Sequence, residues 1–243
     1  MPVAKTSQKF TVSSRLAVVI GIGLLSVAGL QLQSSAAAES AVKIPPLTDQ
    51  PASESKATQE TAVFAGGCFW GIQGVFQHTK GVLQAVSGYA GGSKTTAHYE
   101  MVGSGLTGHA EAVQVTFDPK QVSYAQLLQI FFSVAHDPTQ LNMQYPDRGT
   151  QYRSAVFYAD ATQKQATERY IAQLDTAKVF PKKIVTQVTP LNGFFAAEDY
   201  HQDYATLHPE SGYIATYDLP KIANLKTLYA SSYRPEPVLV GKR

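Results

Sequence analysis

The sequence predicts an α+β (mixed α/β) fold, in which helices flank a central mixed sheet within a single domain. Short runs of β-branched and aromatic residues alternate with longer segments of helical periodicity, but not in the strict order of a doubly wound sheet. The chain after residue 60, about 180 residues, is long enough to bury one core. No internal repeat or low-complexity tract divides it. These three observations favour one domain, which we place at residues 61–213.

The first half of this domain is predicted to hold three strands and two helices. Thr61 to Gly66 is a short β-type run, and the segment from Cys68 to His78 can be helical. Val82 to Tyr89 is a second strand, which ends in a glycine-rich turn. Glu111 to Phe117 alternates in polarity, as a half-buried strand does. Ser123 caps a helix that runs to Val134 with an apolar face of leucines and phenylalanines.

The second half is predicted to hold two strands and two helices. Ser154 to Tyr158 is a strand, and Asp160 then begins a helix that runs to about Ala177. Ile184 to Thr189 is rich in β-branched residues and is predicted to be the last strand. Glu198 to Leu207 is predicted to be a short helix.

The first 38 residues have the pattern of a secretory signal peptide. A basic segment precedes an apolar stretch from Leu16 to Leu30, and small residues then offer a cleavage site after Ala38. The apolar stretch is shorter than the ~20 residues of a membrane span, so an uncleaved anchor is the weaker alternative. We therefore expect export to a bacterial periplasm, with another lumen or the cell exterior as alternatives, and no stable membrane association after cleavage.

Charge argues against a nucleic-acid-binding protein. The whole chain has a formal net charge of +2, and its first 38 positions hold three basic residues and no acidic one. Without them the net charge is −1, and no basic patch remains to bind a phosphate backbone. A monomer is the default expectation.

Two segments flank the predicted domain. Residues 39–60 are expected to form a flexible linker, because they combine three prolines with many Ser, Thr, Gln and Ala and few bulky apolar residues. Residues 214–243 are expected to form a C-terminal tail. Within it, Leu219 to Tyr229 is predicted to be an amphipathic helix that covers the body, and residues 234–237 are predicted to be extended.

Cys68 is the only cysteine of the chain, and it lies in the motif Gly67-Cys68-Phe69-Trp70-Gly71. A lone cysteine is more often a small buried hydrophobe than a nucleophile. Here a glycine turn between strand and helix would place the sulfur at a helix N-terminus, which favours the thiolate and lowers its pKa. One cysteine supplies neither an internal disulfide nor a structural zinc site, and we expect no metal.

Six motifs occur in the order found in one enzyme family. They are Gly67–Gly71 (G-C-F-W-G), Gly88–Gly92 (G-Y-A-G-G), Thr107–Val113 (T-G-H-A-E-A-V), His136–Pro138 (H-D-P), Asp147–Ser154 (D-R-G-T-Q-Y-R-S) and Ala197–Gln202 (A-E-D-Y-H-Q). Together they resemble the peptide methionine sulfoxide reductases of the A class, over about residues 61–213. The resemblance implies that family's ferredoxin-like sandwich and the reduction of methionine S-sulfoxide, protein-bound or free, to methionine. It implies no cofactor.

The resemblance also implies two catalytic residues. Cys68 would attack the sulfoxide sulfur as a thiolate, and Glu111 would protonate the oxygen. For Glu111 to hold a proton near neutral pH its pKa must be raised, which an apolar pocket would do by desolvating the carboxylate. Without the motif, Glu111 would be assigned to a solvated face of its strand.

Five further residues match substrate-binding positions of the family. Tyr99 and Tyr152 would hold the sulfoxide oxygen through their hydroxyls, although tyrosines are usually amphipathic packing residues. Asp147 would orient the substrate, or it is only a turn residue after a proline. Phe69 and Trp70 would form an apolar wall around the substrate methyl group, and core packing is compatible with that role.

The chain departs from the family near its end. Many members carry a resolving cysteine in a G-Y-C motif, where this chain has Gly212-Tyr213-Ile214. Cys68 is therefore expected to become a sulfenic acid that an external thiol reduces, whether thioredoxin, glutaredoxin with glutathione, or a dithiol. The expected partners are that thiol and proteins containing methionine sulfoxide.

Two other classes of protein fit a reactive or buried Cys68. A thiol peroxidase or a cysteine hydrolase would use the same sulfur, the hydrolase with His109 as its base. A non-catalytic binding module would recognise oxidised methionine or keep Cys68 inert. The ordered motifs favour the reductase over both.

Overall fold

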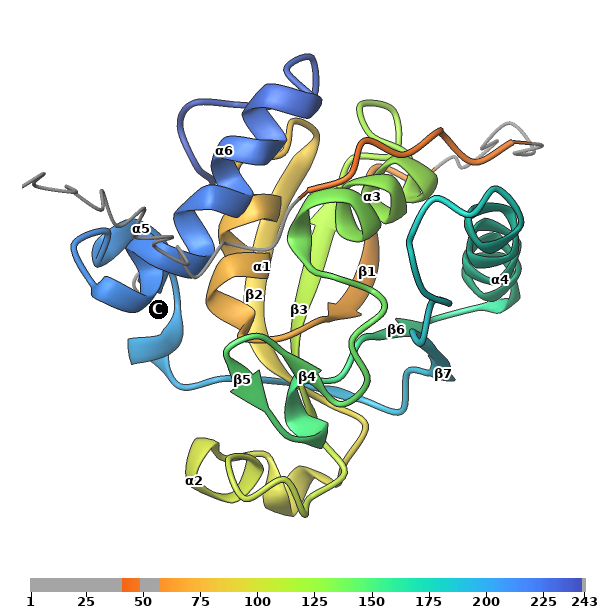
Figure 1. Ribbon diagram of the computed structural model, residues 1–243. Coiled ribbons are helices and arrows are strands. Elements are labelled where there is room, and N and C mark those ends of the chain that lie inside the picture. Colours follow the sequence, from red (N-terminus) through yellow and green to blue (C-terminus); the bar gives the residue numbers. More distant parts are fainter. Residues whose placement is uncertain (1–40, 49–56, 242–243) are drawn as a thin grey trace, which may run out of the picture. The chain divides into compact units, whose positions relative to one another are not determined.

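A six-stranded mixed sheet forms the centre of the fold (Figure 1). The computed structural model describes residues 41–48 and 57–241. The strands lie in the order β7-β6-β1-β3-β2-β8, with β6 and β7 parallel and the other neighbours antiparallel. Their bounds are β1 (Glu60–Ala65), β2 (Val82–Ala90), β3 (Ala110–Phe117), β6 (Ala155–Tyr158), β7 (Gln187–Pro190) and β8 (Phe194–Ala196). A separate small hairpin pairs β4 (Met143–Gln144) with β5 (Asp147–Arg148).

Six α-helices accompany the sheet in the described residues. They are α1 (Phe69–Gln77), α2 (Tyr99–Val102), α3 (Tyr124–Ile130), α4 (Ala161–Thr176), α5 (Tyr204–Leu207) and α6 (Leu219–Leu228). A capping box at Ser123 starts α3, and the Asp160 side chain caps α4. Five-residue π-helical segments follow α3 and precede α6, at Phe131–Ala135 and Ile214–Asp218.

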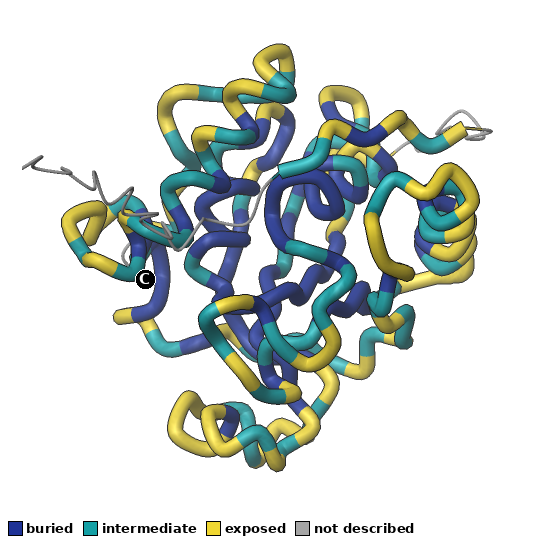
Figure 2. Tube along the Cα trace, in the orientation of Figure 1, coloured by how far each residue is buried: buried dark blue, intermediate teal, exposed yellow. Residues whose placement is uncertain are grey.

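The main core lies between the helices and one face of the sheet. Phe64 of β1 stacks on Phe76 of α1 at 5.1 Å between ring centroids, and on Phe131 at 4.9 Å. The opposite face carries a smaller cluster, rich in alanine, that includes Ala65 and Ala112. This alternation follows from the two-residue period of a strand. Figure 2 shows the buried residues concentrated in the central strands and α1, with exposed residues along the outer side of α4.

The predicted fold class is confirmed: the sheet is mixed and helices flank it. The predicted helix from Glu198 to Leu207 is instead interrupted. A 3-10 turn, Asp199–His201, precedes α5, and Asp203 between them has a left-handed φ of +59°. The last predicted strand, Ile184 to Thr189, begins later than predicted, at Gln187. Sequence periodicity did not reveal α2 or β8.

Residues 41–48, which fall in the predicted flexible linker, pack on the domain. The Val42 N–H donates to the Ser133 carbonyl at 3.1 Å, and Ile44 is buried. Tyr170 and Gln129 donate to carbonyls of this segment at 2.6 and 2.9 Å. The prediction of flexibility was based on side-chain composition, but these bonds are made to backbone carbonyls, which every residue has. This part of the predicted linker is therefore ordered. The predicted signal peptide and its cleavage site lie outside the described residues.

The predicted C-terminal helix is confirmed as α6, and it packs closely on α1. Leu225 is fully buried. A Cβ added at Gly74 of α1 would lie 2.9 Å from Cδ1 of Ile222, so the glycine lets the two helices approach. Much of the predicted tail therefore belongs to the core. No helix within residues 41–48 and 57–241 has the length and apolar character of a membrane span.

Candidate active site

Cys68 lies at the N-terminus of α1, as the sequence predicts. It is the N-cap residue of that helix and is 8 % exposed. The turn from β1 to α1 depends on Gly67, whose φ is +98° and whose missing Cβ would lie 2.7 Å from the Gln144 side chain. A residue with a side chain would be strained at this position.

The first N–H groups of α1 point at acidic partners. The Phe69 N–H donates to Oε2 of Glu111 at 3.0 Å, and the Trp70 N–H hydrogen-bonds to Cys68. Glu111 reaches this position from β3, where it pairs in register with Tyr89 of β2. The helix N-terminus thus holds the predicted acid beside the predicted nucleophile.

Glu111 has the proton affinity that general acid catalysis requires. Burial raises its pKa from 4.5 to about 8, against the opposing effect of the Phe69 N–H. The charges of Asp147 and Asp218 raise it further. The carboxyl group is therefore mostly protonated at neutral pH and can donate a proton.

The expectation of a lowered thiol pKa is wrong. Burial raises the pKa of Cys68 well above its usual value, and the charges of Glu111 and Asp218 add to this effect. Of the main influences on the Cys68 pKa, only the hydrogen bond from the Trp70 N–H favours the thiolate. Desolvation and nearby carboxylates thus outweigh the helix dipole on which the expectation was based. The sulfur of the free protein is a thiol.

The predicted polar residues gather around these two groups. Tyr99 begins α2, Tyr152 ends a 3-10 turn, and Asp147 lies in β5. Burial is the largest cause of the raised pKa of both tyrosines, and the charge of Glu111 is the second. Cys68 also raises the pKa of both. Asp147 raises the pKa of Glu111, so all three lie within electrostatic reach of the centre. The two tyrosine hydroxyls remain protonated donors.

Phe69 and Trp70 supply apolar surface beside the sulfur. Phe69 is buried, with its ring centroid 6.5 Å from that of Trp70. Trp70 is partly exposed and stacks on Tyr204 at 3.9 Å. Both residues serve the core and also border the site.

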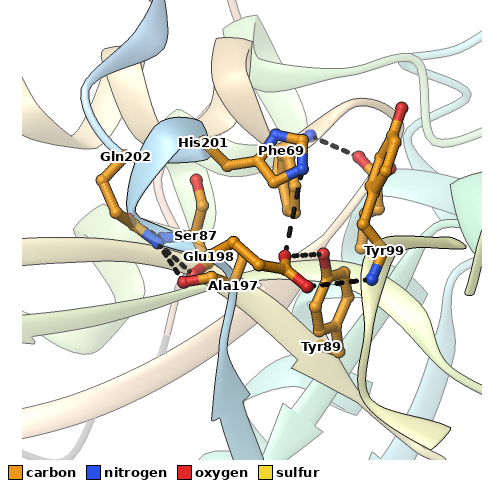
Figure 3. A network of polar contacts seen from close by, with 9 residues as sticks. Phe69, Ser87, Tyr89, Tyr99, Ala197, Glu198, His201 and Gln202 are labelled. Carbon is orange, nitrogen blue, oxygen red and sulfur yellow. Dashed lines mark hydrogen bonds and ion pairs between the residues drawn. The ribbon is translucent and has the colours of Figure 1, made fainter.

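A polar network that the sequence did not predict supports this wall (Figure 3). Glu198 accepts hydrogen bonds from the Tyr89 hydroxyl at 2.8 Å and from the Tyr99 backbone N–H at 3.1 Å. His201 lies 4.0 Å from the same carboxylate, and its ring packs on Tyr99 and Phe69 at 4.4 and 5.1 Å. The signal was the motif A-E-D-Y-H-Q, to whose residues the sequence alone assigned no roles.

Tyr213 is a second residue whose role the sequence did not predict. Its hydroxyl donates a short hydrogen bond to Oδ2 of Asp147, and its ring meets Trp70 edge-on at 6.1 Å. Tyr213 thereby connects the predicted Asp147 to the predicted Trp70. The signal was its place beside Ile214, where many family members carry cysteine.

His109 has partners of its own. Its Nδ1 accepts the Gly92 N–H at 3.2 Å, and its Nε2 lies 2.9 Å from the Ser93 carbonyl. Both ring nitrogens are thus engaged by the loop, so the geometry does not support a Cys–His pair. Within the part of the chain that the structure describes, no three His, Cys, Asp or Glu side chains group as metal ligands would.

Comparison with known proteins agrees with this geometry. The model of the family described as peptide methionine sulfoxide reductase matches residues 60–232. The chain is 61% identical over 181 residues to peptide methionine sulfoxide reductase MsrA 2 of Mesorhizobium japonicum, covering 74% of this chain and 93% of that protein. It is 44% identical over 192 residues to the protein of the same name from Synechocystis, covering 79% and 90%.

Two solved structures share the fold. Reduced Mxr1 from Saccharomyces cerevisiae has a TM-score of 0.60 and 30% identity, over 67% of this chain and 93% of that one. Methionine sulfoxide reductase A of Corynebacterium diphtheriae has a TM-score of 0.55 and 34% identity, over 70% and 88%.

Proposed function

The chain belongs to the peptide methionine sulfoxide reductase family, and we propose that Cys68 and Glu111 are the residues that carry out its reaction. The enzyme reduces methionine S-sulfoxide, protein-bound and free, to methionine with electrons from a thiol, and so repairs oxidised proteins. The observation that supports the assignment is the hydrogen bond from the Phe69 N–H to Glu111, which holds a protonated acid next to the only sulfur nucleophile.

In the proposed reaction, the Cys68 sulfur attacks the sulfoxide sulfur while Glu111 donates its proton to the sulfoxide oxygen. The net change moves one oxygen atom from the substrate sulfur to the Cys68 sulfur. The sulfoxide S–O bond breaks, the thiol is oxidised to a sulfenic acid, and the proton that the thiol gives up replaces the one that Glu111 donated. The substrate leaves as a thioether. Because the free enzyme holds a thiol, the thiolate forms as the substrate takes up the proton from Glu111.

The surrounding residues are proposed to bind the substrate. Tyr99 and Tyr152 donate hydrogen bonds to the sulfoxide oxygen, and both are protonated donors in the free enzyme. Phe69 and Trp70 contact the methyl group, and Asp147, held by Tyr213, orients the polar part of the substrate.

Regeneration is proposed to need a thiol from another molecule, because the chain has one cysteine. A thiol of thioredoxin, of glutaredoxin with glutathione, or of a small dithiol would attack the sulfenic acid to form a mixed disulfide with Cys68 and release water, and a second thiol would then displace Cys68 as a free thiol. The test is a steady-state assay with each reductant and peptide methionine S-sulfoxide. Repeated turnover identifies a competent reductant, and the absence of repeated turnover with a low-molecular-weight thiol refutes the small-thiol version.

We also propose that residues 1–38 direct export to the periplasm and that the mature enzyme works as a monomer. The support is the basic, apolar and small-residue pattern of the segment. Expression of the full chain in a Gram-negative host, followed by fractionation, mass measurement and size-exclusion chromatography, tests all parts. The proposal predicts a periplasmic monomer that begins at Glu39, and a full-length cytoplasmic protein refutes it.

A further inference from the structure

The C-terminal segment buries an ion pair against α1. Asp218 ends the second π-helical segment, Lys221 follows one turn later in α6, and the Lys221 Nζ lies 3.4 Å from Oδ1 of Asp218. The two side chains are 0% and 8% exposed. Lysine and aspartate are almost never fully buried unless they are paired, and burial of the pair is costly. Neither residue belongs to the catalytic set proposed above.

The absence of a side chain at Gly71 lets this ion pair pack directly against α1. A Cβ at Gly71 would collide with Oδ1 of Asp218 and lie 3.1 Å from the Lys221 Nζ. Gly71 is the third residue of α1, and Cys68 is its N-cap. In a capping box, the third helical residue reaches back across the first turn to the N-cap residue. The Asp218 carboxylate therefore occupies the space of a side chain at position 71, on the turn that carries the nucleophile.

The N-terminus of α1 thus receives three acidic groups. Glu111 accepts the Phe69 N–H, the Cys68 sulfur accepts the Trp70 N–H, and Asp218 lies at Gly71. The positive end of the helix dipole favours each negative charge, but the charges repel one another. Oδ2 of Asp218 has no hydrogen-bond partner among the described residues, and Lys221, bonded to Oδ1, offsets part of the charge of the carboxylate.

We propose that Asp218 and Lys221 are positioning residues that set the electrostatic potential at Cys68, with Asp218 opposing the thiolate and Lys221 favouring it. After burial and Glu111, Asp218 is the next largest cause of the raised pKa of Cys68. Burial raises the pKa of Asp218 to about 6 and also raises that of Asp147, and the Lys221 charge opposes both shifts. The other titratable groups facing the sulfur are Glu111 of β3, Asp147 of β5 and the hydroxyls of Tyr99, Tyr152 and Tyr213. Asp218 thus adds to the effect of burial in keeping the sulfur a thiol in the free enzyme, and Lys221 limits the contribution of Asp218.

The test is the rate at which a neutral alkylating reagent modifies Cys68 at pH 8, followed by mass spectrometry of the full-length protein. A charge next to a thiol moves its pKa by about 1 unit, and the lower nucleophilicity of a more acidic thiolate offsets part of the gain. We expect D218N to react about threefold to tenfold faster than the parent and K221M to react slower by a similar factor. The matched control is D203N, because Asp203 is buried at the other end of α1, where it accepts from Gln77 at 2.6 Å.

Opposite changes in the two variants, with D203N unchanged, support the proposal. If the ion pair had only a structural role, both D218N and K221M would loosen the site and be alkylated faster. Rates that change in the same direction in the two variants therefore overturn the proposal. Unchanged rates in variants whose circular dichroism matches the parent also overturn it. The inference rests on the proposed role of Cys68. However, alkylation reads the ionisation of the thiol and not sulfoxide reduction, so the two proposals can fail separately.

Discussion

Glu111 accepts a 3.0 Å hydrogen bond from the backbone N–H of Phe69, the residue that follows Cys68. The acid and the nucleophile are therefore fixed to adjacent positions of one helix N-terminus, although their side chains come from different elements. The same bond lowers the pKa of Glu111, so the value of about 8 is a balance between burial and this donor. Catalysis by this pair depends on that balance.

Removing the acid should stop most of the reaction. Glu111→Gln keeps the size of the side chain but cannot donate a proton to the oxygen, and general acid catalysis contributes about 10²- to 10⁴-fold. We expect kcat for peptide methionine S-sulfoxide to fall within this range while Cys68 remains free. Glu168→Gln, on the exposed face of α4, serves as the control and should match the parent. A Glu111→Gln enzyme with nearly full activity would remove Glu111 from the mechanism.

Glu111 should also make stability depend on pH. Its pKa is about 8 in the folded protein and near 4.5 when unfolded. Between these values the folded state binds more protons, so its free energy of unfolding falls as pH rises, by up to about 1.4 kcal/mol per pH unit. Glu111→Gln lacks this slope. Urea titrations from pH 5 to 8 should show the variant gaining stability relative to the parent as pH rises, and a constant difference would contradict the assigned pKa.

His109 should matter for stability and little for chemistry. His109→Ala removes a buried ring and its hydrogen bonds to the half-buried Gly92 and the exposed Ser93, and each such bond contributes about 0.5–1.5 kcal/mol. Thermal unfolding should show a lower Tm, with kcat of the folded enzyme within a few-fold of the parent. Loss of activity at an unchanged Tm would revive a Cys–His mechanism.

Glu198 should act through Tyr99. Glu198→Ala frees the Tyr99 N–H and the Tyr89 hydroxyl, and misplacement of a group near the reacting atoms can cost about 10²-fold. Because Tyr99 is proposed to hold the oxygen in the transition state, we expect kcat to fall more than KM changes. Glu198→Gln, which retains one acceptor oxygen, should recover part of the loss. Glu210→Ala, whose side chain is 75% exposed, is the control. A change confined to KM would rule out this positioning role.

The parts of the site that the sequence predicts are those with local signals. The glycines before Cys68 mark the turn into α1. Glu111 lies in the same alternating phase as Val113 and Val115, and that phase faces the main core. The family motif identified Glu111, and its place in the apolar phase of the strand is a sign of burial that the assignment to a solvated face overlooked.

The parts that the sequence does not predict depend on contacts between distant segments. When the C-terminal segment folds onto the domain, Asp218 contacts Gly71 and Tyr213 bonds to Asp147. A single sequence does not indicate which distant residues will form such pairs. The four residues of α2 and the three of β8 are too short to show a period. The prediction of a lowered thiol pKa failed first because it did not count the burial of Cys68, and second because it did not count the carboxylates of distant segments.

The most direct test of the central claim is a single-turnover experiment. Reduced mature protein is mixed with excess peptide methionine S-sulfoxide without any other thiol, and methionine and protein mass are measured. The account predicts about one methionine per enzyme and a sulfenic acid on Cys68, with none formed by Cys68→Ser. No methionine from folded protein with a free Cys68 thiol, or several per enzyme, would contradict it.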